Sequence, residues 1–62
     1  MYELKRTYIF KVKSPETEKG FTYYTGIVEG IESNIVFIHT IKNEDISFSL
    51  NQILKSKDKT DE

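Results

Sequence analysis

Apolar and polar side chains alternate along residues 2–13, and this pattern constrains the chain more than any other feature. The largely apolar set consists of Tyr2, Leu4, Arg6, Tyr8, Phe10 and Val12, and the largely polar set of Glu3, Lys5, Thr7, Ile9, Lys11 and Lys13. A β-strand with one buried face requires this period of two, whereas a helix needs apolar residues at spacings of three and four. We therefore expect a first strand over residues 2–13.

Three more segments have the length and composition of strands. Residues 21–31 form the second, and Gly26 and Gly30 within it indicate a bulge or a sharp bend. Residues 35–41 are almost continuously apolar, which favours a strand at the centre of a sheet, and residues 45–50 alternate again. The apolar residues are mostly Ile, Val, Phe and Tyr, without Ala or Trp, and such residues favour strands over helices.

The remaining segments are interpreted as connections and ends. Residues 14–20 contain Pro15 and Gly20 among charged side chains and are expected to form a loop. Ser49 either caps a single helical turn over residues 51–53, or Ile53 and Leu54 begin a fifth strand. Residues 55–62 hold three lysines, three acids and no apolar residue, so we expect a disordered charged tail after a domain of residues 1–54.

These elements predict an all-β fold, namely one small antiparallel barrel of the SH3-like or Sm-like kind, or a strongly curved sheet, with four or five strands. The alternative is a curved meander that a partner chain completes. Both architectures leave an exposed sheet edge. A length of 62 residues excludes a multidomain enzyme with a deep cleft between lobes.

One short segment resembles a known family. Gly26 is followed two residues later by Val28, then by the acid Glu32 and by Asn34 at the start of an apolar strand. This order is similar to the first signature of Sm-like proteins and extends over about a dozen residues. The resemblance implies barrel geometry and a pocket for a single-stranded base that includes Asn34. The second signature of that family, an Arg-Gly or Lys-His pair near the last two strands, is missing from residues 45–54.

The sequence contains no recognisable catalytic arrangement, and we expect a protein that is not an enzyme and needs no cofactor or metal. Cysteine is absent and His39 is the only histidine, so the chain lacks the Cys and His ligands that zinc sites use and no zinc site within one chain is expected. His39 shares its phase with Ile35 and Phe37, so we interpret it as a partly buried or rim residue, with a binding or pH-sensing role as the alternative.

Charge does not indicate a general affinity for nucleic acid, because the formal net charge is −1. Lys5, Lys11 and Lys13 nevertheless share the polar face of the first predicted strand and, with Asn34, form the candidate nucleic-acid site. Tyr8 and Phe10 have the opposite phase and are assigned to the core. A further set of acids is expected either to gather near one end of a meander, where it would guide a basic partner, or to be scattered for solubility. It comprises Glu29, Glu32, Glu44 and Asp45.

Surplus apolar residues suggest a contact surface. Tyr23 and Tyr24 are adjacent on one predicted strand, so one of the two should be exposed and able to anchor a partner. Ile9 lies in the lysine phase of its strand, and Val36 and Ile38 are opposite in phase to their apolar neighbours. Either a wrapped barrel covers both faces, or these residues contact a partner or a second copy of the chain.

These observations lead to two functional hypotheses. The first is a non-enzymatic interaction module, a regulator or inhibitor of the kind found in compact bacterial or mobile-element genomes, which binds a protein partner or itself. Its candidate contact residues are Ile9, Tyr23, Tyr24, Val36 and Ile38. The alternative is an Sm-like oligomer that binds RNA or single-stranded DNA. Without a secretory signal or a long apolar run, a cytoplasmic location with no membrane contact is expected.

Overall fold

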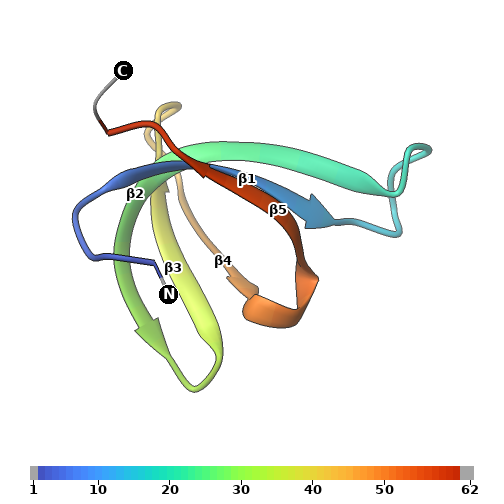
Figure 1. Ribbon diagram of the computed structural model, residues 1–62. Helices are drawn as coiled ribbons and strands as arrows, with labels where there is room; N and C mark the ends of the chain where they lie inside the picture. The colour runs from blue at the N-terminus through green and yellow to red at the C-terminus, as the bar shows by residue number, and fades with distance from the viewer. Residues whose placement is uncertain (1, 61–62) are drawn as a thin grey trace.

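The computed structural model describes residues 2–60, which form one five-stranded antiparallel sheet with the strand order β4-β3-β2-β1-β5 (Figure 1). The strands are β1 (Thr7–Lys13), β2 (Phe21–Glu32), β3 (Ile35–Thr40), β4 (Asp45–Ser49) and β5 (Ile53–Asp58), and a 3₁₀ turn, η1 (Leu50–Gln52), connects the last two. No α-helix occurs within residues 2–60. The all-β prediction is confirmed.

The sheet is not closed into the predicted barrel. Strands β4 and β5 are its two edges, and no ladder joins them in the part of the chain that the structure describes. Each neighbouring pair of strands is antiparallel, as a meander requires. The sheet therefore keeps two edges whose backbone groups remain available for pairing.

The core lies on one face of this sheet. It consists of Tyr8, Phe10, Val12, Val28, Val36, Ile38 and Phe48. Phe10 lies at its centre, with its ring edge-to-face against Phe48 at a centroid distance of 5.2 Å. The rings of Phe10 in β1 and Phe48 in β4 meet although two other strands separate β1 from β4 in the sheet. The assignment of Tyr8 and Phe10 to the core is confirmed.

Two glycines shape β2. A Cβ atom on Gly26 would lie 2.5 Å from the backbone oxygen of His39, so β2 and β3 approach here more closely than any side chain allows. The β2–β3 register shifts between Val28 and Gly30, which is the bulge that a glycine within the strand predicts.

The first strand is shorter than predicted. It begins at Thr7 rather than at Tyr2, because Lys5 adopts a left-handed backbone conformation (φ 66°) and its N–H donates to the carbonyl of Val28 at 2.8 Å. Tyr2 nevertheless packs against the core, and its ring contacts Phe10 edge-to-face at 5.1 Å. The alternating pattern identified the apolar face correctly but not the start of the strand.

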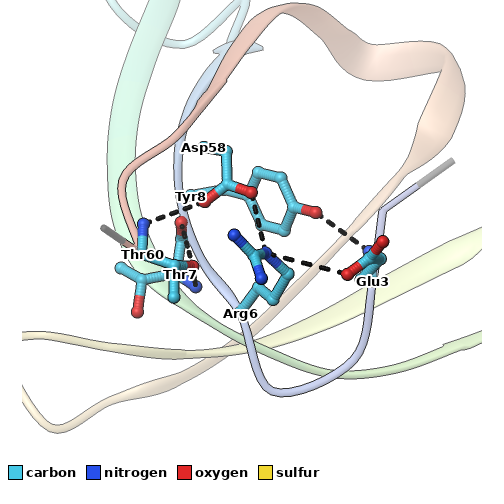
Figure 2. A network of polar contacts seen from close by, with 6 residues as sticks. All are labelled: Glu3, Arg6, Thr7, Tyr8, Asp58 and Thr60. Atoms are coloured by element: carbon cyan, nitrogen blue, oxygen red, sulfur yellow. Dashed lines mark hydrogen bonds and ion pairs between the residues drawn. The ribbon is translucent and has the colours of Figure 1, made fainter. Parts of the chain in front are cut away.

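The predicted disordered tail over residues 55–62 is wrong for residues 55–58, which belong to β5 and pair with β1. Figure 2 shows Arg6 between two carboxylates, with its Nε atom 2.8 Å from Asp58 and 3.7 Å from Glu3. The Thr60 N–H and the Arg6 guanidinium lower the pKa of Asp58 below its ordinary value. Backbone pairing and polar contacts thus hold a strand that buries little apolar surface. Residues 61–62 lie outside the described part of the chain.

The connection between β4 and β5 combines both sequence alternatives. Ser49 caps η1, since its Oγ accepts a hydrogen bond from the N–H of Asn51 at 3.1 Å. The side chain of Gln52 accepts a bond from the Ser49 N–H at 3.0 Å, which completes a capping box. The fifth strand then begins at Ile53.

Candidate interaction surface

The five candidate partner-binding residues are not all on one surface. Ile9 and Tyr23 lie on the outer face, which we define as the face of the sheet opposite the core. Tyr23 is 60% exposed, whereas Tyr24 is half-buried and stacks on Phe48 at a centroid distance of 5.8 Å. The expectation that one of the two tyrosines is exposed is confirmed.

Val36 and Ile38 belong to the core. They are 0% and 1% exposed, so no partner reaches them in the folded chain. The residues of β3 that face outward are those of the opposite phase, of which Phe37 is 43% exposed. A strand that is apolar in both phases does not reveal which phase is buried, and this is why the sequence favoured the wrong one.

A shallow groove of about 170 Å³ lies across β5, β1 and β2 on the outer face. We call it the outer groove, and it is lined by Ile9, Lys11, Tyr23, Lys55, Ser56 and Lys57. The strand registers produce it, because Lys11 lies opposite Tyr23 on β2 and opposite Lys55 on β5. Ile9, Lys11 and Tyr23 are among the candidates that the sequence indicates, whereas Lys55 and Lys57 lie in the segment that the sequence predicts to be a tail.

The outer groove has a positive rim. Lys11 and Lys55 are directly opposite each other on antiparallel strands, an arrangement that is destabilising for two like charges. The ammonium group of Lys11 lies 4.3 Å from the centre of the Phe21 ring, which in turn meets Tyr23 edge-to-face at 5.4 Å. Lys11 and Lys55 form no ion pair with any residue in the range 2–60. A bound anionic group would relieve this repulsion.

The candidate nucleic-acid residues are dispersed. Lys5 precedes β1 and forms an ion pair with Glu29 at 3.0 Å. Asn34 lies in the turn between β2 and β3 with a φ of 68°, a conformation that asparagine tolerates well, and its amide donates to Ser49 at 3.4 Å. Only Lys11 and Lys13 share the outer face of β1, so the set does not form one site.

A second depression, of about 250 Å³, lies over β2, β3 and β4. We call it the acidic hollow, and it is lined by Glu29, Phe37, Ile38, Asp45, Ile46 and Ser47. Glu29 comes from the bulge of β2 and Asp45 from the start of β4, with the exposed ring of Phe37 on the strand between them. Two of the four acids that the sequence singled out therefore line one depression.

His39 stabilises the turn between β3 and β4. Its Nδ1 atom is 2.8 Å from a carboxylate oxygen of Asp45, and its Nε2 atom is 2.9 Å from the side-chain oxygen of Asn43. A doubly protonated ring donates to both oxygens, and these hydrogen bonds raise the pKa of His39. Because the folded-state pKa is the higher one, the stabilisation is present at low pH and is lost as the pH rises through that pKa.

Within residues 2–60, no group of three or more His, Asp or Glu side chains is placed to hold a metal ion. Over the same range, no helix is both long and apolar enough to cross a membrane. Comparison of the chain with models of known protein families, with curated proteins and with solved structures finds no match.

Proposed function

We propose that this chain is a non-enzymatic interaction module that binds a protein partner through the outer groove. The observation that carries the proposal is the exposed ring of Tyr23, which lies beside Ile9 and opposite Lys11, and Lys11 in turn faces Lys55 across β1 and β5. Tyrosines in such positions are common energetic centres of protein interfaces, because they bury a large area at a small cost in conformational entropy.

The groove also defines the chemistry of the partner. An acidic side chain placed between Lys11 and Lys55 would remove their mutual repulsion, and an apolar or aromatic group would cover Tyr23 and Ile9. A chain of this size acts on a partner by occupying its surface, which is how a small regulator or inhibitor works. Five antiparallel strands with a bulged β2 support the wider relationship to SH3-like and Sm-like small β-proteins within this proposal.

Single-stranded nucleic acid is the second candidate ligand. The observation in its favour is that Phe21 and Tyr23 lie on the same sheet face as Lys11, Lys13 and Lys55, so that aromatic rings and cationic groups alternate. Bases stack on such rings while lysines contact phosphates. Against it, the formal net charge is −1, and Asn34 and Lys5 lie outside this surface.

A capture experiment separates the two ligands. Tagged wild-type chain, the double variant Lys11→Glu/Lys55→Glu and the control Lys19→Glu/Lys42→Glu are each incubated with nuclease-treated and untreated native lysate. Both variants change the charge equally, and the groove variant keeps like charges opposite each other, so the fold should be unaffected. We expect the groove variant to retain at least about tenfold less protein than wild type and control, with or without nuclease.

Two outcomes would contradict the proposal. Equal capture of protein by the groove variant and the control would place the contact elsewhere on the molecule. Recovery of nucleic acid as the main bound material, only in untreated lysate and with strong dependence on salt, would favour the second ligand instead.

A further inference from the structure

We infer that the outer groove binds the acidic hollow of a second copy of the same chain, so that molecules associate head to tail. This inference rests on the proposed function and names the partner of the outer groove. Tyr23 of one copy enters the hollow beside Phe37 of the next, and Lys11 and Lys55 meet Glu29 and Asp45 on its rim.

Charge and the presence of an exposed ring match between the two surfaces. The outer groove has Lys11 and Lys55 on one side of the exposed Tyr23 ring, and the acidic hollow has two carboxylates beside the exposed Phe37 ring in a depression of about 250 Å³. Opposite charges orient the two copies, and the contact between the rings excludes water. Two of the large apolar side chains that are exposed belong to these surfaces, namely Tyr23 to the groove and Phe37 to the hollow.

The carboxylates of the hollow remain able to bind a partner. Glu29 is paired with Lys5 and Asp45 with His39, but all four side chains are substantially exposed to solvent. Ion pairs in such positions contribute little free energy, so exchanging them for a contact with another molecule costs little. Lys11 and Lys55, by contrast, form no ion pair within residues 2–60, so the second copy would provide their first acidic neighbours among the residues described.

The two surfaces of one molecule cannot meet each other. Tyr23 and Gly30, which pairs with Phe37, are seven residues apart on the continuous strand β2. At about 3.3 Å per residue this separation is roughly 23 Å, and a hydrogen-bonded strand does not fold back on itself. Only another copy can bring the two surfaces together. Because groove and hollow are different surfaces, the contact is heterologous, and each bound pair still presents one free groove and one free hollow.

A mixing experiment tests this arrangement. The groove variant Lys11→Glu/Lys55→Glu keeps the hollow, and the hollow variant Glu29→Lys/Asp45→Lys keeps the groove. Far-ultraviolet circular dichroism confirms that each is folded, and sedimentation velocity measures mass. We expect the mass of the wild-type chain to rise with concentration and to fall in about 0.5 M NaCl, where charges are screened within a few ångströms.

Each variant alone should remain monomeric at concentrations where the wild type associates. Their equimolar mixture should associate as the wild type does, because the intact groove of one variant binds the intact hollow of the other and the two charge-reversed surfaces also attract each other. A chain with all four substitutions has exchanged charges and should associate again. The substitutions Lys19→Glu/Glu18→Lys serve as the control and should behave as wild type.

Three results would overturn the inference. A monomeric wild type at every concentration, or a mixture that stays monomeric, would show that groove and hollow do not bind each other. If each variant alone associates as the wild type does, the contact lies elsewhere, for example between sheet edges. Capture from lysate tests the proposed function separately. The proposed function survives the first two results if the groove variant still fails to capture protein, and it fails if the groove variant captures as much protein as the wild type.

Discussion

Replacement of Phe10 by alanine is expected to leave most molecules unfolded at room temperature. The Phe10 side chain is 0% exposed and contacts the rings of Tyr2, Tyr8 and Phe48. Truncation of a buried phenylalanine costs about 3–5 kcal/mol. A single core in a chain of this size supplies only about 3–5 kcal/mol of net stability, so the loss consumes most of it. Urea denaturation followed by circular dichroism measures the effect.

Phe37→Ala provides the matched control for this prediction. The same side chain is removed, but Phe37 is on the outer face and 43% exposed. We expect its free energy of unfolding to fall by only about 1 kcal/mol. If Phe10→Ala unfolds at nearly the same urea concentration as the wild type, then the core does not have the arrangement described.

Deletion of residues 55–62 is expected to abolish the stable fold. The deletion removes the pairing of residues 55–58 with β1 and the contact between Arg6 and Asp58. It also exposes the edge of β1, whose unpaired backbone groups then favour aggregation. Circular dichroism and sedimentation of the shortened chain measure the loss of structure and the rise in mass.

A substitution in the full-length chain tests the same strand without a change of length. Lys57 lies opposite Ile9, two residues before Lys59, whose N–H donates to the Thr7 carbonyl at 2.7 Å, so the Lys57 N–H also faces β1. Proline at position 57 cannot donate this backbone hydrogen bond, so Lys57→Pro should lower stability strongly, whereas Lys57→Ala keeps the backbone hydrogen bond. Wild-type stability of the shortened chain would mean that β5 is dispensable, as the sequence pattern had suggested.

The face of each strand could be predicted where apolar and polar residues alternate. Tyr8, Phe10 and Val12 are buried because only one face of β1 is covered, and the same rule separated Tyr23 from Tyr24. The rule fails for Val36 and Ile38, since both phases of β3 are apolar. It fails for β5 for a different reason. That strand is held by backbone bonds and polar contacts, which leave no apolar pattern in the sequence.

The candidate site could be predicted only in part, because it depends on register. Ile9 was recognisable as an apolar residue among lysines, and Tyr23 as one of two adjacent tyrosines. The position of Lys55 opposite Lys11 follows from pairing between segments that are more than forty residues apart in the chain. The acidic hollow likewise requires the bulge in β2 and the alignment of three strands, which local composition does not encode.

Photo-crosslinking from position 23 tests most directly whether the outer groove is the contact surface. The photoreactive residue p-benzoylphenylalanine replaces Tyr23 in one chain and Leu4 in a control, and these two side chains are 60% and 57% exposed. After irradiation in cells, adducts are sorted by protease and nuclease sensitivity and by mass. We predict that position 23 forms a protein adduct that contains a second copy of the chain, and that position 4 forms little adduct. Equal yields from both positions, or an adduct that nuclease alone removes, would contradict the proposal.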